Sequence, residues 1–198
     1  MADGSSIGHG VDWPISVEIT YANSGDYQMQ IKRQFTVNAS ADRLWEIMGQ
    51  EFGQVSHWAS SIHDSQGRNT GRVLEGAPCS GRVCETAMGN FKEQIHTYDE
   101  SSKTLAYDAK GDKMPFFVKR LANNWTFTPL SEGKCKVDMR MEIGLLPVFN
   151  LLMAPMMRIQ MGGVIEQIIE ELSYFAENGT PHPRKLEAQQ KLQLKGAI

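Results

Sequence analysis

Residues 35–48 read Phe35-Thr-Val-Asn-Ala-Ser-Ala-Asp-Arg-Leu-Trp-Glu-Ile-Met48, and residues 52–58 read Phe52-Gly-Gln-Val-Ser-His-Trp58. Before Ser40 the apolar residues alternate as in a strand, and after it they recur at helical spacing. Ser40 is itself a favourable N-cap, because its hydroxyl can accept from a free backbone N–H of the first turn. The stretch therefore predicts a strand that leads directly into a helix over residues 40–49, followed by a second short helix over residues 51–58.

Composition limits the classes of function open to this chain. Its 198 residues, 41% of them hydrophobic, suit one domain with a substantial core. The formal net charge of -3 provides no basic field for phosphate binding, so we expect no nucleic-acid partner. Three cysteines (Cys79, Cys84 and Cys135) are too few for a disulfide framework and favour a reducing compartment. We therefore expect a cytoplasmic protein.

The domain prediction places one folded domain at residues 27–179, between an N-terminal arm (1–26) and a C-terminal tail (180–198) that is either frayed or a short solvated helix. The first residues lack the basic start and apolar core of a secretory signal. Residues 145–165 are strongly apolar, but polar residues and prolines interrupt them, so we expect no transmembrane segment.

Alternation predicts the strands and their inner faces. Residues 27–37 form the first predicted strand, and turn formers divide residues 71–128 into successive hairpins. Residues 134–144 alternate most cleanly, with apolar side chains on one face and charged ones on the other. The same parity predicts further inward side chains on the preceding strands: Phe91, Glu93, Ile95, Leu105, Tyr107, Leu121, Asn123, Trp125 and Phe127.

A long helix follows and is predicted to end at Asn178-Gly179. In its first half, residues 151–161, apolar side chains nearly encircle the axis. Such a segment must be covered on most sides or must face a cavity filled by a ligand. Gly162-Gly163, in mid-helix, indicates a close approach or a hinge, since each glycine costs roughly 1 kcal/mol relative to alanine.

Three residues are the candidates for acid/base chemistry: Glu93, Tyr107 and His57. A carboxylate on the inner face has a raised pKa unless a cation meets it, and Arg72 and Arg82 are the cations that could do so. Tyr107 could polarise a ligand oxygen and His57 could shuttle a proton at the cavity mouth. The alternative is a paired carboxylate, a satisfied core tyrosine and a solvated loop histidine.

Ten residues are candidates for lining a ligand cavity: Trp58, Glu85, Asn123, Trp125, Phe127, Met139, Met141, Met153, Met157 and Met161. Glu85 is included because its parity with Val83 predicts an inward side chain. The methionines could adapt to bulky apolar guests, or could simply fill gaps in the core. Cys79 and Cys84 are five residues apart and do not match zinc-ligand spacing, and phosphate and dinucleotide motifs are absent, so we expect neither metal nor cofactor.

The order of these elements resembles the START/polyketide-cyclase (SRPBCC) superfamily, the helix-grip proteins related to birch pollen allergen, and most closely its polyketide cyclase/dehydrase and lipid-transport branch. The matching segments are residues 37–45, 52–58, 81–86, 91–99 and 105–107 and the terminal helix. The resemblance implies an α+β fold, in which a curved antiparallel sheet of about seven strands wraps around a long C-terminal helix and encloses an apolar cavity.

The resemblance also implies alternative functions. Some members bind or carry lipids, hormones or quinones, which predicts a hydrophobic small-molecule ligand that is polyketide-, lipid- or terpenoid-like. Others cyclise or dehydrate polyketides, so a cyclase, dehydratase or isomerase remains an alternative. A third hypothesis is a protein-interaction module that uses the apolar terminal helix, and both a monomer and a homodimer remain open.

Overall fold

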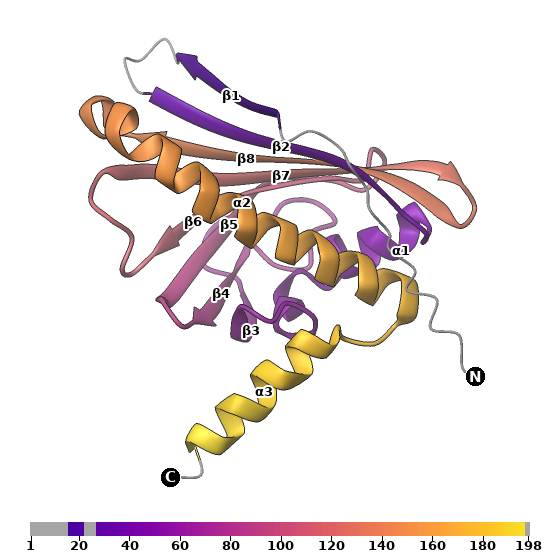
Figure 1. Ribbon diagram of the computed structural model, residues 1–198. Coiled ribbons are helices and arrows are strands. Elements are labelled where there is room, and N and C mark those ends of the chain that lie inside the picture. Colours follow the sequence, from indigo (N-terminus) through magenta and orange to yellow (C-terminus); the bar gives the residue numbers. More distant parts are fainter. Residues whose placement is uncertain (1–15, 22–26, 197–198) are drawn as a thin grey trace, which may run out of the picture.

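The structure, a computed structural model, describes residues 16–21 and 27–196, with side chains at residues 29–146, 149, 156–157 and 159–194. One antiparallel sheet of eight strands curves around a long helix (Figure 1). The strands are β1 (Ser16–Tyr21), β2 (Tyr27–Val37), β3 (Ile62–Arg68), β4 (Gly81–Thr86), β5 (Gly89–Asp99), β6 (Thr104–Gly111), β7 (Val118–Ser131) and β8 (Lys134–Leu145). Their order across the sheet is β1-β2-β8-β7-β6-β5-β4-β3.

Five helical segments complete the fold. They are α1 (Ala41–Trp45), the π-helical η1 (Glu46–Gln50), the 3-10 helix η2 (Phe52–His57), α2 (Pro147–Asn178) and α3 (Pro183–Gly196). None of the helices in the described part of the chain is long and apolar enough to cross a membrane.

The helix-grip fold predicted from the sequence is confirmed. Ser40 caps α1 by accepting from the Arg43 backbone N–H at 3.1 Å. The helix then widens into η1, where Gly49 lies against the Trp45 indole, so that a Cβ added at Gly49 would come within 3.0 Å of the ring. At its far end α2 stops at Gly179, which adopts the left-handed conformation (φ 70°) that favours glycine.

Two elements, β1 and β3, were not predicted. β1 pairs with the first half of β2 and lies within the segment expected to be an N-terminal arm. β3 was missed because residues 62–68 are mostly polar and show no apolar alternation. α3 lies in the predicted tail, where a short helix was one of two alternatives, and it extends away from the sheet near β3 (Figure 1).

The inner face of the sheet is the core, as alternation predicted. On β6, β7 and β8 the inward side chains Leu105, Tyr107, Trp125, Phe127 and Val137 are buried. The opposite face of β8 carries basic and acidic residues, among which Arg140 pairs with Glu142.

Glu171 fastens the second half of α2 to the rest of the fold. Its side chain is fully buried, and it accepts hydrogen bonds from the Ser60 backbone N–H (2.8 Å) and hydroxyl (2.6 Å). Gln167, one turn earlier, donates to the same hydroxyl at 2.7 Å. From α3, Arg184 donates to Glu171 at 3.0 Å. A buried carboxylate with this many donors is strongly held, so the Ser60 loop, α2 and α3 are joined at one point.

A close approach of β4 to β5 yields a stability prediction. A Cβ at Gly81 would lie 2.0 Å from the Glu93 carbonyl oxygen, whereas one at Gly133 would meet nothing within 4 Å. We therefore expect Gly81→Ala to lower the free energy of unfolding by more than about 1 kcal/mol, because the two strands must separate. Gly133→Ala should change it by less than about 0.5 kcal/mol. Urea unfolding of both variants tests this; equal midpoints would contradict it.

Candidate functional site

A buried ion pair lies on the inner face, where β4 meets β5. Arg82 and Glu93 are directly opposite in the register of the two strands, so their side chains share a face. The Arg82 Nε donates to Glu93 Oε2 at 2.5 Å, and both residues are at least nine-tenths buried. The inward position predicted for Glu93 is where the structure places it, and its partner is one of the two arginines considered.

The pairing shows that the parity expected for β4 was wrong. Arg82 and Cys84 point inward and are buried, whereas Val83 is half-buried and Glu85 is exposed. The β4–β5 turn determines which residues of β4 face inward. Thr86 lies opposite Gly89, and the register that follows places Arg82 opposite Glu93. Glu85 therefore does not line the interior.

Arg82 is held on every side. It donates to the Phe52 carbonyl at 2.8 Å, and its guanidinium lies 4.0 Å from the Phe52 ring centroid and 5.3 Å from that of Tyr107. Burial by itself would lower the pKa of Arg82, but the charge of Glu93, the neighbouring Tyr107 and Cys84 and the hydrogen bond to Glu93 together outweigh burial, and the pKa is raised. The arginine is therefore a permanent cation at the sheet's inner surface, and Glu93 is its counter-ion.

Tyr107 and Asn123 lie next to this pair, directly opposite each other on β6 and β7. Burial raises the pKa of the Tyr107 phenol, and the nearby Glu93 charge raises it further, so the hydroxyl stays protonated at neutral pH. Asn123 is 8% exposed, and its amide makes no hydrogen bond to any described residue. The Trp125 indole N–H lies beside the Tyr107 hydroxyl but lacks a hydrogen bond of normal geometry. The Asn123 amide and the Trp125 indole N–H on the inner face are therefore available to hydrogen-bond a ligand.

Apolar side chains surround the polar groups. Met141 lies opposite Asn123, and Met139 lies opposite Trp125, both inward and buried. Across from them on α2, Met157 and Met161 are half-buried against the core. Towards its C-terminal end α2 is closed onto the sheet, with Ile165 and Leu172 fully buried. The helix is therefore packed tightly at one end and less tightly at the other.

The remaining candidates lie apart from the polar groups or contribute only packing. His57 is exposed at the end of η2 and contacts neither Glu93 nor Tyr107 in the described part of the chain. Trp58 and Phe127 are buried members of the core cluster. The Met153 side chain lies outside the described residues. The described residues bring together no group of three metal-ligating side chains.

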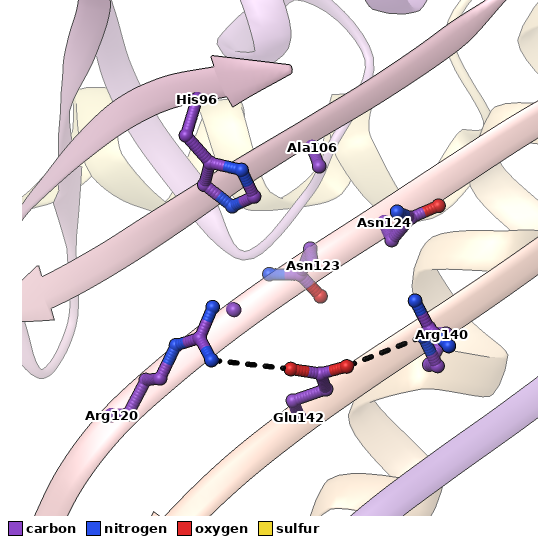
Figure 2. Close-up of a pocket in the computed structure, with 8 residues that line it drawn as sticks. His96, Ala106, Arg120, Asn123, Asn124, Arg140 and Glu142 are labelled. Carbon is purple, nitrogen blue, oxygen red and sulfur yellow. Dashed lines mark ion pairs between the residues drawn. The ribbon is translucent and has the colours of Figure 1, made fainter.

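A shallow pocket of about 150 Å³ lies on the opposite, outer face of the sheet (Figure 2). Ala106 and Ala122 leave a depression there, and Arg120, Arg140 and Glu142 border it. Glu142 pairs with both arginines, at 3.5 Å and 3.3 Å. Charged and open, this pocket does not suit an apolar ligand.

The polar groups thus lie on the concave face of a sheet that wraps around a helix (Figure 1). The model of the family described as polyketide cyclase/dehydrase and lipid transport matches residues 28–173. The chain belongs to this family. The match spans the sheet from β2 to β8 and most of α2, so it contains the whole inner face. Comparison with curated proteins gives no significant match.

Solved structures share the fold at low sequence identity. A START superfamily protein from Mycobacterium smegmatis superposes with a TM-score of 0.60 at 17% identity, covering 76% of this chain and 99% of that one. Norcoclaurine synthase from Thalictrum flavum, in complex with dopamine and hydroxybenzaldehyde, gives a TM-score of 0.55 at 16% identity, covering 76% of this chain and 87% of that one. At such identities the likeness concerns the fold alone.

Buried acidic groups give the protein a predictable response to alkaline pH. Burial raises the pKa of the Cys84 thiol from 9.0 to about 12, and the Glu93 charge contributes. Below pH 9 the thiol is protonated in both states. Above it the unfolded chain loses the proton first, so the free energy of unfolding falls between about pH 9 and 12, by up to about 1.4 kcal/mol per pH unit.

Urea unfolding at pH 8, 9 and 10 tests this, with Cys84→Ala as the comparison. The variant should lose stability less steeply than the natural protein over that interval. Parallel curves would show that Cys84 is not the group responsible.

Proposed function

We propose that the protein binds a hydrophobic small molecule carrying a carbonyl or hydroxyl oxygen, between the concave face of the sheet and the first half of α2. The observation that carries this proposal is a pair of polar groups in the middle of an apolar inner surface: the Asn123 amide, and the Trp125 indole N–H, which has no hydrogen bond of normal geometry.

Hydrogen bonding is the physical argument. A buried polar group without a partner costs about 1–3 kcal/mol, and native proteins satisfy nearly all such groups. A ligand oxygen placed between β6 and β7 could accept from Asn123 and from the indole of Trp125. The apolar remainder of the ligand would contact the inner methionines, whose flexible side chains adapt to bulky shapes. Polyketide-, lipid- and terpenoid-like compounds combine these two features.

The structures of relatives are consistent with such a ligand. Norcoclaurine synthase holds dopamine and hydroxybenzaldehyde, which are small oxygenated aromatics. The family description includes lipid transport as well as cyclase and dehydrase activities. We therefore place binding first and treat catalysis as a second candidate.

Gly162 and Gly163 supply a means of ligand entry. An added Cβ at either position would meet nothing within 4 Å, so close packing does not account for the two glycines. They separate the half of α2 anchored by Glu171 from the half that covers the proposed site. A hinge there would let the first half move while the anchored half stays in place.

Catalysis is the second candidate, favoured by the contact between Glu93, Arg82 and Tyr107. A protonated Tyr107 can donate to a developing oxyanion, and the fixed charge of Arg82 stabilises negative charge nearby. In this alternative Glu93 is the general acid or base of a cyclase, dehydratase or isomerase. The proposed site and the ligand class are the same in both candidates.

Protein interaction is the third candidate, because part of α2 is open to solvent. Ile159 is 78% exposed, and Met156 and Val164 are exposed beside it on α2. Sedimentation over a range of protein concentrations distinguishes this candidate, since it alone requires a partner or a second copy at this helix.

Two asparagines on β7 test the binding proposal. In the sheet register Asn123 lies opposite the inward Tyr107 and Met141, whereas Asn124 lies opposite the outward Arg140, although both residues border the outer pocket. For an oxygen-bearing ligand recovered from the protein, we expect Asn123→Leu to weaken binding about tenfold, as loss of one hydrogen bond would. Asn124→Leu should leave the affinity unchanged. Calorimetric titration measures both; equal affinities in the two variants would place the ligand elsewhere.

Glu93→Gln, with Glu85→Gln as the control, separates binding from catalysis. If the protein is an enzyme, Glu93→Gln should abolish conversion of the recovered compound while binding persists, because the amide cannot take up or release the proton. Glu85 is exposed, so its variant should behave as the natural protein. Unchanged conversion in Glu93→Gln would remove the carboxylate from the mechanism. Chromatography with mass detection follows the product, after unfolding curves confirm that both variants are folded.

A further inference from the structure

Two loops meet at one end of the sheet, the β4–β5 turn and the connection from β6 to β7. The Asp112 backbone N–H donates to the Asn90 carbonyl at 2.9 Å. A Cβ added at Gly89 would lie 3.5 Å from Cδ of Lys113, so the lysine stem passes close to the turn. The two loops are therefore neighbours that form one end of the molecule. We call this end, residues 85–92 and 110–119, the loop surface.

Two large apolar side chains are exposed at the loop surface. Met88, in the β4–β5 turn, is 66% exposed, and Phe116, in the second loop, is 71% exposed. Turns favour glycine, proline and small polar residues for reasons of backbone geometry, and these do not account for a methionine or a phenylalanine at either position. Exposed apolar side chains gathered on adjacent loops indicate an interaction site.

A cluster of aromatic rings supports Phe116. Its ring centroid lies 5.7 Å from that of Phe117 and 5.3 Å from that of Phe149, in the first turn of α2. Phe117 and Phe149 stack on each other at 4.9 Å. The Leu146 backbone N–H donates to the Phe117 carbonyl at 2.9 Å and joins the loop to the start of the helix. One side of the Phe116 ring is therefore packed, while most of the ring faces solvent.

The loop surface is also positively charged. Four of its residues are exposed lysines: Lys92, Lys110, Lys113 and Lys119. None of the four makes an ion pair with a residue that the structure describes. Against these four lysines the loop surface holds two carboxylates, Glu85 and Asp112, so its net charge is +2 in a chain whose net charge is -3. Positive charge is thus concentrated at the end of the molecule that exposes the apolar side chains.

Two of these lysines are directly opposite each other. The register of β5 and β6 pairs Lys92 with Lys110, so both side chains leave the same face of the sheet. Like charges at directly opposite positions destabilise a sheet. On the same outer face Arg120 is compensated, because it pairs with Asp108 at 3.3 Å. The Lys92–Lys110 arrangement therefore does not serve stability, and its chemistry suits the binding of anionic groups.

We propose that the loop surface docks on an anionic lipid membrane, with Phe116 and Met88 entering the headgroup region and the lysines contacting the lipid headgroups. Attachment to a membrane surface combines burial of apolar side chains with attraction between basic residues and anionic lipids. The loop surface supplies both. The lysine stems are apolar and can lie along the inserted side chains while their ammonium groups remain at the headgroups.

The charges favour a membrane over other partners for an apolar surface. A second copy of the chain would bring its own lysines against those of the first, and like charges would repel. A nucleic acid would require a basic field over a larger part of the protein, which the net charge of -3 does not provide. An anionic lipid surface matches the lysines and accepts the apolar side chains as well.

Docking at the loop surface leaves the inner face of the sheet untouched. The inference therefore goes beyond the proposed function and does not depend on it, since a protein that binds no small molecule could dock in the same way. Phe149 belongs to the half of α2 that covers the proposed ligand site. A docked protein would hold that half of the helix close to the lipid.

Co-sedimentation of the full-length protein with lipid vesicles tests the proposal. One set of vesicles contains equal parts of phosphatidylcholine and phosphatidylglycerol, and the other contains phosphatidylcholine alone. The test variants are Phe116→Ala and the double variant Lys92→Gln with Lys110→Gln. All three side chains are exposed, so the variants should fold, and unfolding curves check this.

The control variants make the same changes away from the loop surface. Leu130→Ala removes an apolar side chain that is 55% exposed near the β7–β8 turn, which Figure 1 shows at the opposite side of the molecule from the start of α2. Lys134→Gln with Lys191→Gln removes two exposed lysines, from β8 and α3.

We expect the natural protein to sediment with the anionic vesicles and not with phosphatidylcholine alone. Phe116→Ala should weaken this binding about tenfold, because an apolar ring no longer enters the lipid. The Lys92 and Lys110 double variant should weaken it about tenfold as well, because two basic residues are lost from the contact. Both controls should bind as the natural protein does.

Failure of the natural protein to bind anionic vesicles would overturn the proposal. Unchanged binding in Phe116→Ala, or equal losses in test and control variants, would also overturn it, because adsorption would then depend on charge alone or on another surface. Self-association without vesicles that Phe116→Ala abolishes would overturn it in favour of a second copy of the chain.

Discussion

The buried carboxylate of Glu171 holds the long helix to the rest of the molecule. It receives two hydrogen bonds from Ser60 and one from Arg184, so the loop after η2, the second half of α2 and the start of α3 meet at one group. Lys185, itself buried, adds a hydrogen bond from α3 to the Ile62 carbonyl at 2.8 Å. The helix is therefore fixed at one end, and its first half, beyond Gly162-Gly163, lies over the inner face without a comparable anchor in the described part of the chain.

The buried charges of Arg82 and Glu93 lie on the inner face of the sheet, which the helix covers (Figure 1). Burying an ion pair such as Arg82 with Glu93 costs desolvation that a hydrophobic pair would avoid, so the pair is weak evidence for stability alone. What it provides is a fixed electrostatic environment for Tyr107 and Asn123 in a sheet otherwise lined by methionine and aromatic rings. The proposed ligand, an apolar molecule with one well-placed oxygen, would match such a surface.

Alternation alone predicted most of the sheet and part of the site. It placed Glu93, Tyr107 and Asn123 on the inner face, because one side of each strand had to be buried. It failed at β4, where the inward residue is an arginine and the outward one is Glu85; only the hairpin register reveals that Arg82 faces Glu93. In the tail the helix expected as one alternative is present as α3, but Lys185, a residue that composition would place in solvent, is buried because hydrogen bonding compensates its burial.

The most direct test of the account is native mass spectrometry of the protein purified from its natural source, followed by denaturation and identification of what is released. The account predicts a stoichiometric apolar compound that carries a carbonyl or hydroxyl oxygen and that rebinds to the protein after removal. A protein that carries no such compound and binds none from an extract of the same source would contradict a ligand site on the inner face.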